Sequence, residues 1–346
     1  MNVLQLCPVW HPVSRDAPGG IETLLAHLSV HLARRGCALT HLASGESQLE
    51  GRLVSVMPQS VCTLMHEGRA SLHEYFEQHQ LQLAMGFLAE AAVVHSHIGP
   101  SGFVLSALPG MAHKTLHTLH GPVSEELLWF AERNPHVRFS VVSQFQRDRL
   151  RTRASNFCAV VPNGVQVDSF EFSERGAGRL FFMGRIERDK GPDAAIATAK
   201  SLGLPLDLAG PIVQKEFFHK KIEPLLDDQV RYLGILNHEQ KVRRLREADC
   251  VLMPSRWDEP FGLVAVEAMA CGTPVVANRR GALPEIVEDG VTGFIVDDEQ
   301  QIAAAVRKAM ALPRRAVRER CIGRFDLAAV AAKYHDLYGK IAREQE

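Results

Sequence analysis

The sequence lacks several features that would place it in a broad class at once. Its formal net charge is −1 over 346 residues, so there is no general case for nucleic-acid binding. No apolar run approaches the length of about 20 residues that a membrane span needs. The first residues, MNVLQLCPVW, hold no basic segment followed by a long apolar run, so we expect no signal peptide. These absences favour a soluble globular protein, which we expect in the cytoplasm or at the cytoplasmic face of a membrane.

The sequence also lacks a paired-cysteine motif. Its 7 cysteines are odd in number and scattered, with no CxxC pair. Such a set is typical of buried thiols in a reducing compartment rather than of a disulfide framework or a zinc site. His95 and His97 lie close enough in sequence to suggest a metal, but no carboxylate or cysteine completes a set at ligand spacing. We therefore expect no metal and no cofactor.

Short apolar runs alternate with amphipathic segments from end to end, which is typical of βαβ units and parallel sheets. The expected strands are 3–6, 38–42, 93–95, 114–119, 139–142, 159–161, 179–183, 206–209, 230–233, 250–253, 275–277 and 293–296. The expected helices are 21–35, 145–151, 192–201, 240–248, 263–271 and 301–311. The strands form two series, each with a Gly-rich turn after its first strand, so the fold class is α/β with two doubly wound, Rossmann-like domains.

The domain boundary is predicted in the polar, Gly-bearing segment 170–178. This gives a first domain at 1–170 and a second at 176–325. The last segment, 326–346, carries an apolar helical face made of Leu327, Val330, Ala331, Tyr334, Leu337, Tyr338 and Ile341. A terminal helix of this kind must dock, and we expect it to cross back to the first domain.

The most informative stretch is 254–293, in which Glu259 and Glu267 flank a turn at Gly262 that opens a helix. A glycine at a helix N-terminus lets backbone N–H groups approach a phosphate, and the helix dipole favours the negative charge. The acids cannot bind that phosphate, but carboxylates accept hydrogen bonds from sugar hydroxyls. A phosphate cradle with an acid on either side therefore suggests a nucleotide sugar.

Several motifs, taken in order, resemble one family. They are GGIE at 19–22, VVHSH at 93–97, TLHG at 118–121, VPNGV at 161–165, MGRIERDKG at 183–191 and EPFGLVAVE at 259–267. The series is similar to retaining glycosyltransferases of the GT-B fold, of the family 4 (group 1) type, and covers nearly the whole chain. The resemblance implies an N-terminal acceptor-binding domain and a C-terminal nucleotide-sugar-binding domain that face a cleft.

The resemblance implies that Arg185 and Lys190 hold the donor diphosphate. Both flank a turn after the first strand of the second domain, where parallel sheets place ligands. The alternative is a solvated loop in which these cations pair with Glu187 and Asp189. Backbone N–H groups at Gly262 and Leu263 would also bind the phosphates.

The two acids have separate implied roles. Glu267 would accept hydrogen bonds from the ribose, and Glu259 from the transferred sugar, while the backbone near Gly234 would line the nucleobase. An exposed helix acid is the alternative for Glu267. Its apolar neighbours instead indicate a buried helix, in which an acid needs partners.

In the first domain, Gly19 and Gly20 would place backbone N–H groups at a helix N-terminus, with Gly20 towards the donor and Gly19 towards the acceptor. Glu22 either touches the acceptor or favours the helix dipole, and the sequence does not separate these roles. His120 matches the family's active-site histidine, which contacts the transferred sugar. The implied catalytic set is His120, Glu259, Arg185 and Lys190, whereas His95 and His97 are assigned to packing or indirect support.

The implied reaction transfers a hexosyl unit from a nucleoside diphosphate sugar, with UDP first, GDP second and ADP third. The acceptor is a hydroxyl of a glycan, a lipid-linked sugar or a small metabolite, read by loops at about 7–18, 43–60 and 98–108. Four arginines at 147, 149, 151 and 153 either lie against an anionic membrane or belong to an ordinary solvated helix.

Three other classes of protein are alternatives to a glycosyltransferase. A nucleotide-sugar epimerase or a phosphorylase can share the two-domain architecture, but the acid pair with the Arg…Lys turn favours a transferase. A catalytically inactive nucleotide-sugar-binding scaffold would have no need of the whole catalytic set. A nicotinamide oxidoreductase is disfavoured because no GxGxxG with a following ribose-binding acid is present.

Overall fold

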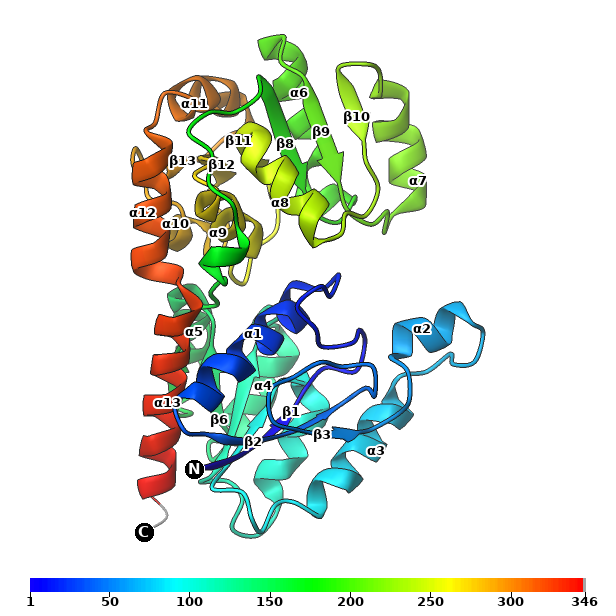
Figure 1. Ribbon diagram of the computed structural model, residues 1–346, viewed down its shortest axis with the longest axis vertical. Coiled ribbons are helices and arrows are strands. Elements are labelled where there is room, and N and C mark those ends of the chain that lie inside the picture. Colours follow the sequence, from blue (N-terminus) through cyan, green and yellow to red (C-terminus); the bar gives the residue numbers. More distant parts are fainter. Residues whose placement is uncertain (345–346) are drawn as a thin grey trace. The chain divides into compact units, whose positions relative to one another are not determined.

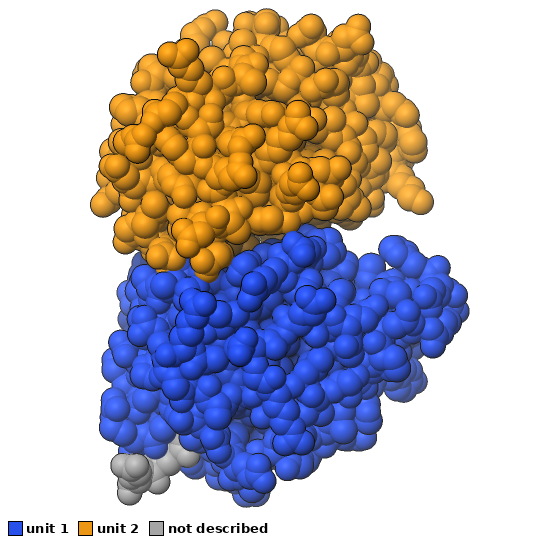
Figure 2. All heavy atoms as spheres, in the orientation of Figure 1, with its two compact units in different colours: residues 1–163, 327–346 blue, residues 164–326 orange. Residues whose placement is uncertain are grey.

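The computed structural model describes residues 1–344, and its contacts divide the chain into two compact units. Unit 1 holds Met1–Asn163 together with the chain from Leu327, and unit 2 holds Gly164–Asp326 (Figure 2). Each unit contains one parallel sheet with helices packed on it (Figure 1). The predicted class, α/β with two parallel-sheet domains, is confirmed.

Unit 1 is built on a 7-stranded sheet in the order β3-β2-β1-β4-β5-β6-β7. Its strands are β1 (Asn2–Leu6), β2 (Ala38–Ala43), β3 (Arg52–Ser55), β4 (Val93–Ser96), β5 (Thr115–Leu119), β6 (Arg138–Val141) and β7 (Cys158–Val160). Its helices are α1 (Gly20–Arg34), α2 (Val61–His66), α3 (Glu74–Met85), η1 (Gly99–Ala107), α4 (Glu125–Arg133), α5 (Gln144–Arg151) and α13 (Leu327–Arg343).

Both faces of this sheet are buried. Successive side chains of a strand point to opposite faces, so Val3 packs in the cluster formed with α1 and α13. Leu4 packs in a second cluster that includes Leu81 of α3. Burial on both faces explains why the strands read as nearly continuous apolar runs.

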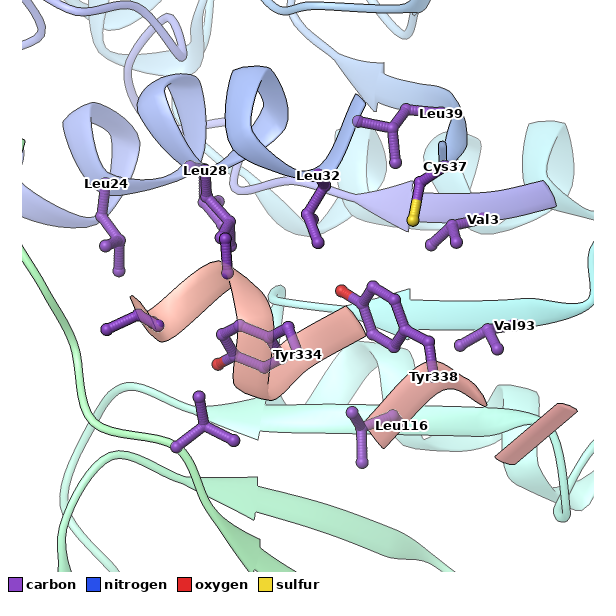
Figure 3. Packing of buried hydrophobic residues seen from close by; sticks show 14 of the residues in the cluster. Val3, Leu24, Leu28, Leu32, Cys37, Leu39, Val93, Leu116, Tyr334 and Tyr338 are labelled. Atoms are coloured by element: carbon purple, nitrogen blue, oxygen red, sulfur yellow. The ribbon is translucent and has the colours of Figure 1, made fainter. Parts of the chain in front are cut away.

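The C-terminal helix α13 completes the core of unit 1. The structure buries the whole apolar face expected for it: Leu327, Val330, Ala331, Tyr334, Leu337, Tyr338 and Ile341. Figure 3 shows Tyr334 and Tyr338 lying between the leucines of α1 and the apolar side chains of the sheet. Each fully buried aliphatic side chain contributes about 1.5–3 kcal/mol, so this helix is a substantial part of the fold. No helix within residues 1–344 is both long enough and apolar enough to cross a membrane.

Unit 2 is built on a 6-stranded sheet in the order β10-β9-β8-β11-β12-β13. Its strands are β8 (Arg179–Met183), β9 (Leu206–Ala209), β10 (Val230–Tyr232), β11 (Ala248–Met253), β12 (Val275–Asn278) and β13 (Gly293–Val296). Its main helices are α6 (Pro192–Leu202), α7 (Lys215–Phe217), α8 (His238–Glu247), α9 (Leu263–Ala270), α10 (Leu283–Ile286), α11 (Ile302–Ala309) and α12 (Arg314–Phe325).

The boundary between the units differs from the predicted segment 170–178. The change falls between Asn163 and Gly164, so residues 164–170 belong to unit 2 rather than to the first domain. The Val165 N–H donates to the Phe325 carbonyl at 3.0 Å. Arg318 of α12 donates to the Phe170 carbonyl at 2.6 Å, and Arg314 donates to that of Ser173 at 2.8 Å. A polar segment resembles a linker in sequence, but here arginines of α12 bind its backbone.

Candidate active site

The order of strands in unit 2 identifies the edge at which a ligand would bind. β8 and β11 are neighbours in the middle of the sheet, and the chain proceeds from them in opposite directions. Open α/β sheets bind ligands at the carboxyl ends of such strands. The turn after β8 carries Arg185 and Lys190, and the segment after β11 carries Ser255, Trp257 and Glu259.

Lys190 and Glu259 meet at this edge. The Lys190 ammonium donates to Glu259 Oε1 at 2.5 Å, and the Ser255 hydroxyl donates to the same oxygen at 2.6 Å. Glu259 is buried, with 5% of its surface exposed. A buried carboxylate needs such partners, because ionisation without them is costly. The solvated-loop alternative paired the Lys190 ammonium with Glu187 or Asp189, but its partner in the structure is Glu259.

Arg185 behaves differently, because it does pair within its own loop. Its Nη2 lies 2.9 Å from Glu187 Oε1, and its side chain is half exposed. The indole of Trp257 joins the two cations: Arg185 Cζ lies 5.5 Å from the ring centroid, and Lys190 Nζ lies 4.4 Å from it. A cation over an indole face is stabilised by the ring quadrupole. Trp257 is thus a site residue that sequence reasoning missed, although it stands between Ser255 and Glu259 in the stretch judged most informative.

The turn that carries Lys190 is held from the segment after β11. The Arg256 N–H donates to the Asp189 carbonyl at 2.7 Å, and its guanidinium donates to the Arg188 carbonyl at 2.9 Å. The same guanidinium binds both oxygens of Asp193 at 3.0 Å and contacts Glu299 at 2.7 Å. Hydrogen bonds to Glu299 and Asp193 raise the pKa of Arg256. Arg256 therefore fixes the position of the turn that carries Lys190. It is not among the site residues predicted from sequence.

Gly262 precedes α9 as predicted, and only glycine suits its position. It is the N-cap of the helix, with φ of +106°, and a Cβ added there would lie 2.8 Å from Leu283 Cδ2. Leu263 is the first helical residue. The first-turn N–H groups of a helix have no intrahelical acceptor, so this end of α9 can bind an anion.

Glu267 lies in the buried helix that its neighbours predicted, and this prediction is confirmed. Only 6% of its surface is exposed. The Lys241 ammonium of α8 donates to Glu267 Oε1 at 2.5 Å and lies 5.7 Å from the Phe170 ring centroid. Lys241 was missed because it belongs to a polar helical pattern, HEQKVRRLRE, that reads as a solvated face.

Gly234 lies at the same carboxyl edge, after β10. It adopts φ of +74°, and its carbonyl accepts from the Gly210 N–H at 2.8 Å. Ile235 beside it is 65% exposed. The role of this backbone at the nucleobase stays a prediction.

Unit 1 has its own switch point, between β1 and β4. The N-terminus of α1 lies after β1, with Gly19 as N-cap and Gly20 as first residue. Glu22 is buried and folds back on this end, because a Cβ at Gly19 would lie 1.9 Å from Glu22 Oε2. Burial raises the pKa of Glu22, while a backbone hydrogen bond and His11 act in the opposite direction. In this structure the carboxylate therefore serves its own helix terminus, which favours the helix-dipole alternative.

His120 follows β5 and lies against another histidine. Its Nε2 is 3.0 Å from His97 Nδ1. Burial lowers the pKa of His120 to about 4. His95 lies in the packing role expected for it, with Nδ1 2.5 Å from the Tyr338 hydroxyl and Nε2 2.6 Å from the Thr118 hydroxyl.

The ion pairs of the basic cluster at 147–153 weaken the alternative in which it lies against an anionic membrane. Arg149 and Arg153 of the basic cluster both pair with Glu125, and Arg153 also pairs with Glu132. Arg147 lies 3.8 Å from Asp148, so three of the four arginines have an acidic partner, which favours the ordinary solvated helix. Among residues 1–344 no three His, Cys, Asp or Glu side chains come close enough together to hold a metal ion. Metal independence itself stays a prediction.

Comparison with known families agrees with this geometry. Residues 18–169 match the family described as Glycosyltransferase Family 4, and residues 169–324 match Glycosyl transferases group 1. The D-inositol 3-phosphate glycosyltransferase of Mycolicibacterium smegmatis is 32% identical over 343 residues, which cover 84% of this chain and 77% of the relative. The glycogen synthase of Mycobacterium tuberculosis H37Rv is 34% identical over 200 residues, covering 52% and 47%.

Solved structures share the fold. Sucrose-phosphate synthase from Thermosynechococcus elongatus aligns with a TM-score of 0.81 at 20% identity, covering 99% of both chains. HepE of Anabaena, solved in complex with UDP and glucose, aligns with a TM-score of 0.76 at 19% identity, covering 98% of this chain and all of the other. The architecture is that of GT-B glycosyltransferases. The chain belongs to glycosyltransferase family 4, the group 1 type, and is a transferase.

Proposed function

We propose that this glycosyltransferase moves a hexosyl unit from a nucleoside diphosphate sugar to a hydroxyl acceptor, with retention at the anomeric carbon. One observation carries the proposal: at the switch point of unit 2, Arg185 and Lys190 both contact the Trp257 ring, and Lys190 also bonds to buried Glu259. The same edge leads into α9, which begins at Gly262 and carries buried Glu267. Cations, a helix N-terminus and two acids suit a ligand with a diphosphate between two sugars.

The diphosphate is expected to bind Arg185, Lys190 and the N–H groups at Gly262 and Leu263. Arg185 offers a planar fork and Lys190 a point charge to the phosphate oxygens. Trp257 contacts both cations, so less side-chain entropy is lost when the ligand arrives. Lys190 would then be shared between Glu259 and a phosphate oxygen.

The sugars are expected to bind the two buried acids, Glu267 the ribose and Glu259 the transferred hexose. An ionised carboxylate has about four acceptor positions, so the bond from Lys241 leaves Glu267 able to accept from hydroxyls. UDP is the first nucleotide to test, because HepE was solved with UDP and with UDP-glucose. GDP and ADP follow it.

The reaction breaks the bond between the anomeric carbon and the diphosphate and forms one from that carbon to the acceptor oxygen. The transition state resembles an oxocarbenium ion. Arg185, Lys190 and the α9 terminus stabilise charge on the leaving diphosphate, so we propose that the reaction needs no metal. The family pattern offers no protein nucleophile, so a leaving phosphate oxygen takes the acceptor's proton on the same face of the sugar.

From unit 1, His120 is expected to contact the transferred sugar, Gly20 the donor and Gly19 the acceptor, while Glu22 supports the N-terminus of α1. A glycan, a lipid-linked sugar and a small metabolite remain the acceptor classes. Because the mycobacterial relative is a D-inositol 3-phosphate glycosyltransferase, a phosphorylated inositol is the first acceptor to test.

The test incubates the full chain with UDP-glucose and an acceptor panel in EDTA and follows the anomeric protons by NMR. An α-linked product from the α-linked donor, absent in Lys190→Ala, supports the proposal. A β-linked product contradicts retention. Conversion of the donor without acceptor indicates an epimerase, and a reaction that requires free phosphate indicates a phosphorylase. UDP binding without any turnover indicates the scaffold.

A further inference from the structure

Two histidines contact each other at the carboxyl edge of the unit 1 sheet. His97 follows β4 and His120 follows β5, which are neighbouring parallel strands. His97 Nδ1 lies 3.0 Å from His120 Nε2, and the ring planes are inclined by 29°. His97 is buried, with 5% of its surface exposed, whereas His120 is half-buried.

Both rings are neutral. Burial lowers the pKa of His120 to about 4 and holds that of His97 well below 6.5. A neutral imidazole has one N–H and one bare nitrogen, so one ring donates in this bond and the other accepts. The hydrogen bond therefore couples the tautomers of the two residues.

The two possible arrangements leave different atoms unpaired. His97 Nε2 and His120 Nδ1 are both buried, and neither has a hydrogen-bond partner among residues 1–344. If His120 donates, the unpaired N–H is at His97 Nε2, in the more buried of the two residues. If His97 donates, the unpaired N–H is at His120 Nδ1, and the deeper atom is a bare nitrogen. Buried donors are left unpaired less often than buried acceptors, so the second arrangement is favoured.

The neighbours of His97 restrict its ring. The His95 ring lies against it, with centroids 4.0 Å apart. His95 is itself held at both nitrogens, by Tyr338 of α13 at 2.5 Å and by Thr118 of β5 at 2.6 Å. The C-terminal helix thus supports His95, which packs on His97, which in turn contacts His120.

We propose that His97 is a positioning residue that fixes His120 in its Nδ1–H tautomer, so that His120 presents a hydrogen-bond donor rather than a base. Its partner would be an oxygen of the transferred sugar, and this identity rests on the proposed function. The tautomer itself rests only on unit 1. His97 acts through His120 and does not touch the ligand.

The test labels the full chain with ¹⁵N-histidine and records two-bond ¹H–¹⁵N spectra near neutral pH. Signals that disappear in His120→Gln assign the residue. The proposal expects His120 protonated at Nδ1 in the wild-type protein and a mixture of tautomers in His97→Phe. A wild-type His120 protonated at Nε2 overturns it, as does a tautomer unchanged by His97→Phe. The wild-type spectrum decides even if that variant fails to fold.

Kinetics give a second readout. A glutamine at position 97 can still donate from its amide, so His97→Gln should keep much of kcat, whereas His97→Phe should lose about tenfold or more. UDP affinity should be unchanged in both variants. Equal losses of kcat in the two would contradict the role of the donated bond. Failure of the wild-type chain to bind any nucleotide would instead overturn the proposed function and leave the tautomer result standing.

Discussion

Lys190 Nζ lies 2.5 Å from Glu259 Oε1, and this contact joins the turn after β8 to the segment after β11. The pair spans the switch point of the unit 2 sheet, with the Trp257 ring beside the ammonium. In this state the charge of the lysine is already balanced. In the proposed donor site a diphosphate would share Lys190 with Glu259, so we expect both residues to affect nucleotide binding and stability.

Replacing Lys190 should reduce both the affinity for UDP and the stability of the protein. Lys190→Met removes the proposed phosphate partner and, among residues 1–344, leaves the buried Glu259 carboxylate with the Ser255 hydroxyl as its donor. We expect UDP affinity to fall by about tenfold or more and the free energy of unfolding to fall by about 1–3 kcal/mol. Calorimetry and urea unfolding measure the two effects. The control is Lys200→Met, a partly exposed lysine paired with Asp227 on the same unit. Wild-type affinity in Lys190→Met would remove it from the donor site.

Trp257 should matter through its ring rather than through a hydrogen bond. Trp257→Ala removes the surface shared by Arg185 and Lys190, and a cation–π contact contributes about 0.5–2 kcal/mol. We expect UDP to bind about 3- to 30-fold more weakly in Trp257→Ala, with a smaller loss in Trp257→Phe. Trp129→Ala, which removes a ring stacked on Arg133 in unit 1, is the matched control. If Phe and Ala at position 257 are equally impaired, the cation–π account is wrong.

The pair Lys241–Glu267 should act on the nucleoside and not on the diphosphate. Glu267→Gln loses the ionised acceptor for ribose, and Lys241→Met leaves that carboxylate without its 2.5 Å partner. We expect both variants to weaken UDP binding, Glu267→Gln more strongly, with pyrophosphate affinity unchanged. Competition between UDP and pyrophosphate measures this. A parallel loss for pyrophosphate would show that the pair supports the phosphate site instead.

The buried histidines of unit 1 predict a dependence of stability on pH. Burial lowers the pKa of His41 to about 4, that of His117 to about 3 and that of His120 to about 4. Unfolding restores the ordinary value of about 6.5, so the unfolded chain binds more protons between these limits. Stability is therefore full above about pH 6.5 and falls as the pH drops towards 4, by on the order of a few kcal/mol for each group.

Thermal unfolding from pH 7.5 to 4 measures this dependence. His117→Gln can keep a hydrogen bond to Ser106 but cannot titrate, so its Tm should fall less steeply with acid. The exposed residue His136 supplies the control, His136→Gln. A wild-type Tm that stays constant or rises over this range would contradict the prediction.

Some elements could be predicted from sequence because their patterns are local. The strands at 179–183, 206–209 and 293–296 have the predicted bounds, since apolar runs there end at turn residues. The apolar face of α13 and the buried setting of Glu267 followed from helical spacing. β3 (Arg52–Ser55) was missed because it is a short edge strand with partly exposed residues. α12 was missed because its many arginines hide an apolar face.

The contacts of the site could not be predicted in the same way. Lys190 and Glu259 are 69 residues apart and meet only because β8 and β11 are neighbours. Lys241 and Glu267 are 26 residues apart on different helices. Sequence motifs named both Lys190 and Glu259, but of the second pair they named Glu267 alone. Strand order and helix packing decide which partner each of these residues meets. The boundary at Asn163 likewise depends on arginines of α12 that lie far along the chain.

The most direct measurement is calorimetry of the full chain against UDP, GDP and ADP in EDTA. The account predicts micromolar binding of one nucleotide, UDP first, that is lost in Glu267→Ala and weakened in Lys190→Ala. Absence of binding by all three nucleotides would contradict the donor site. So would binding that neither variant changes.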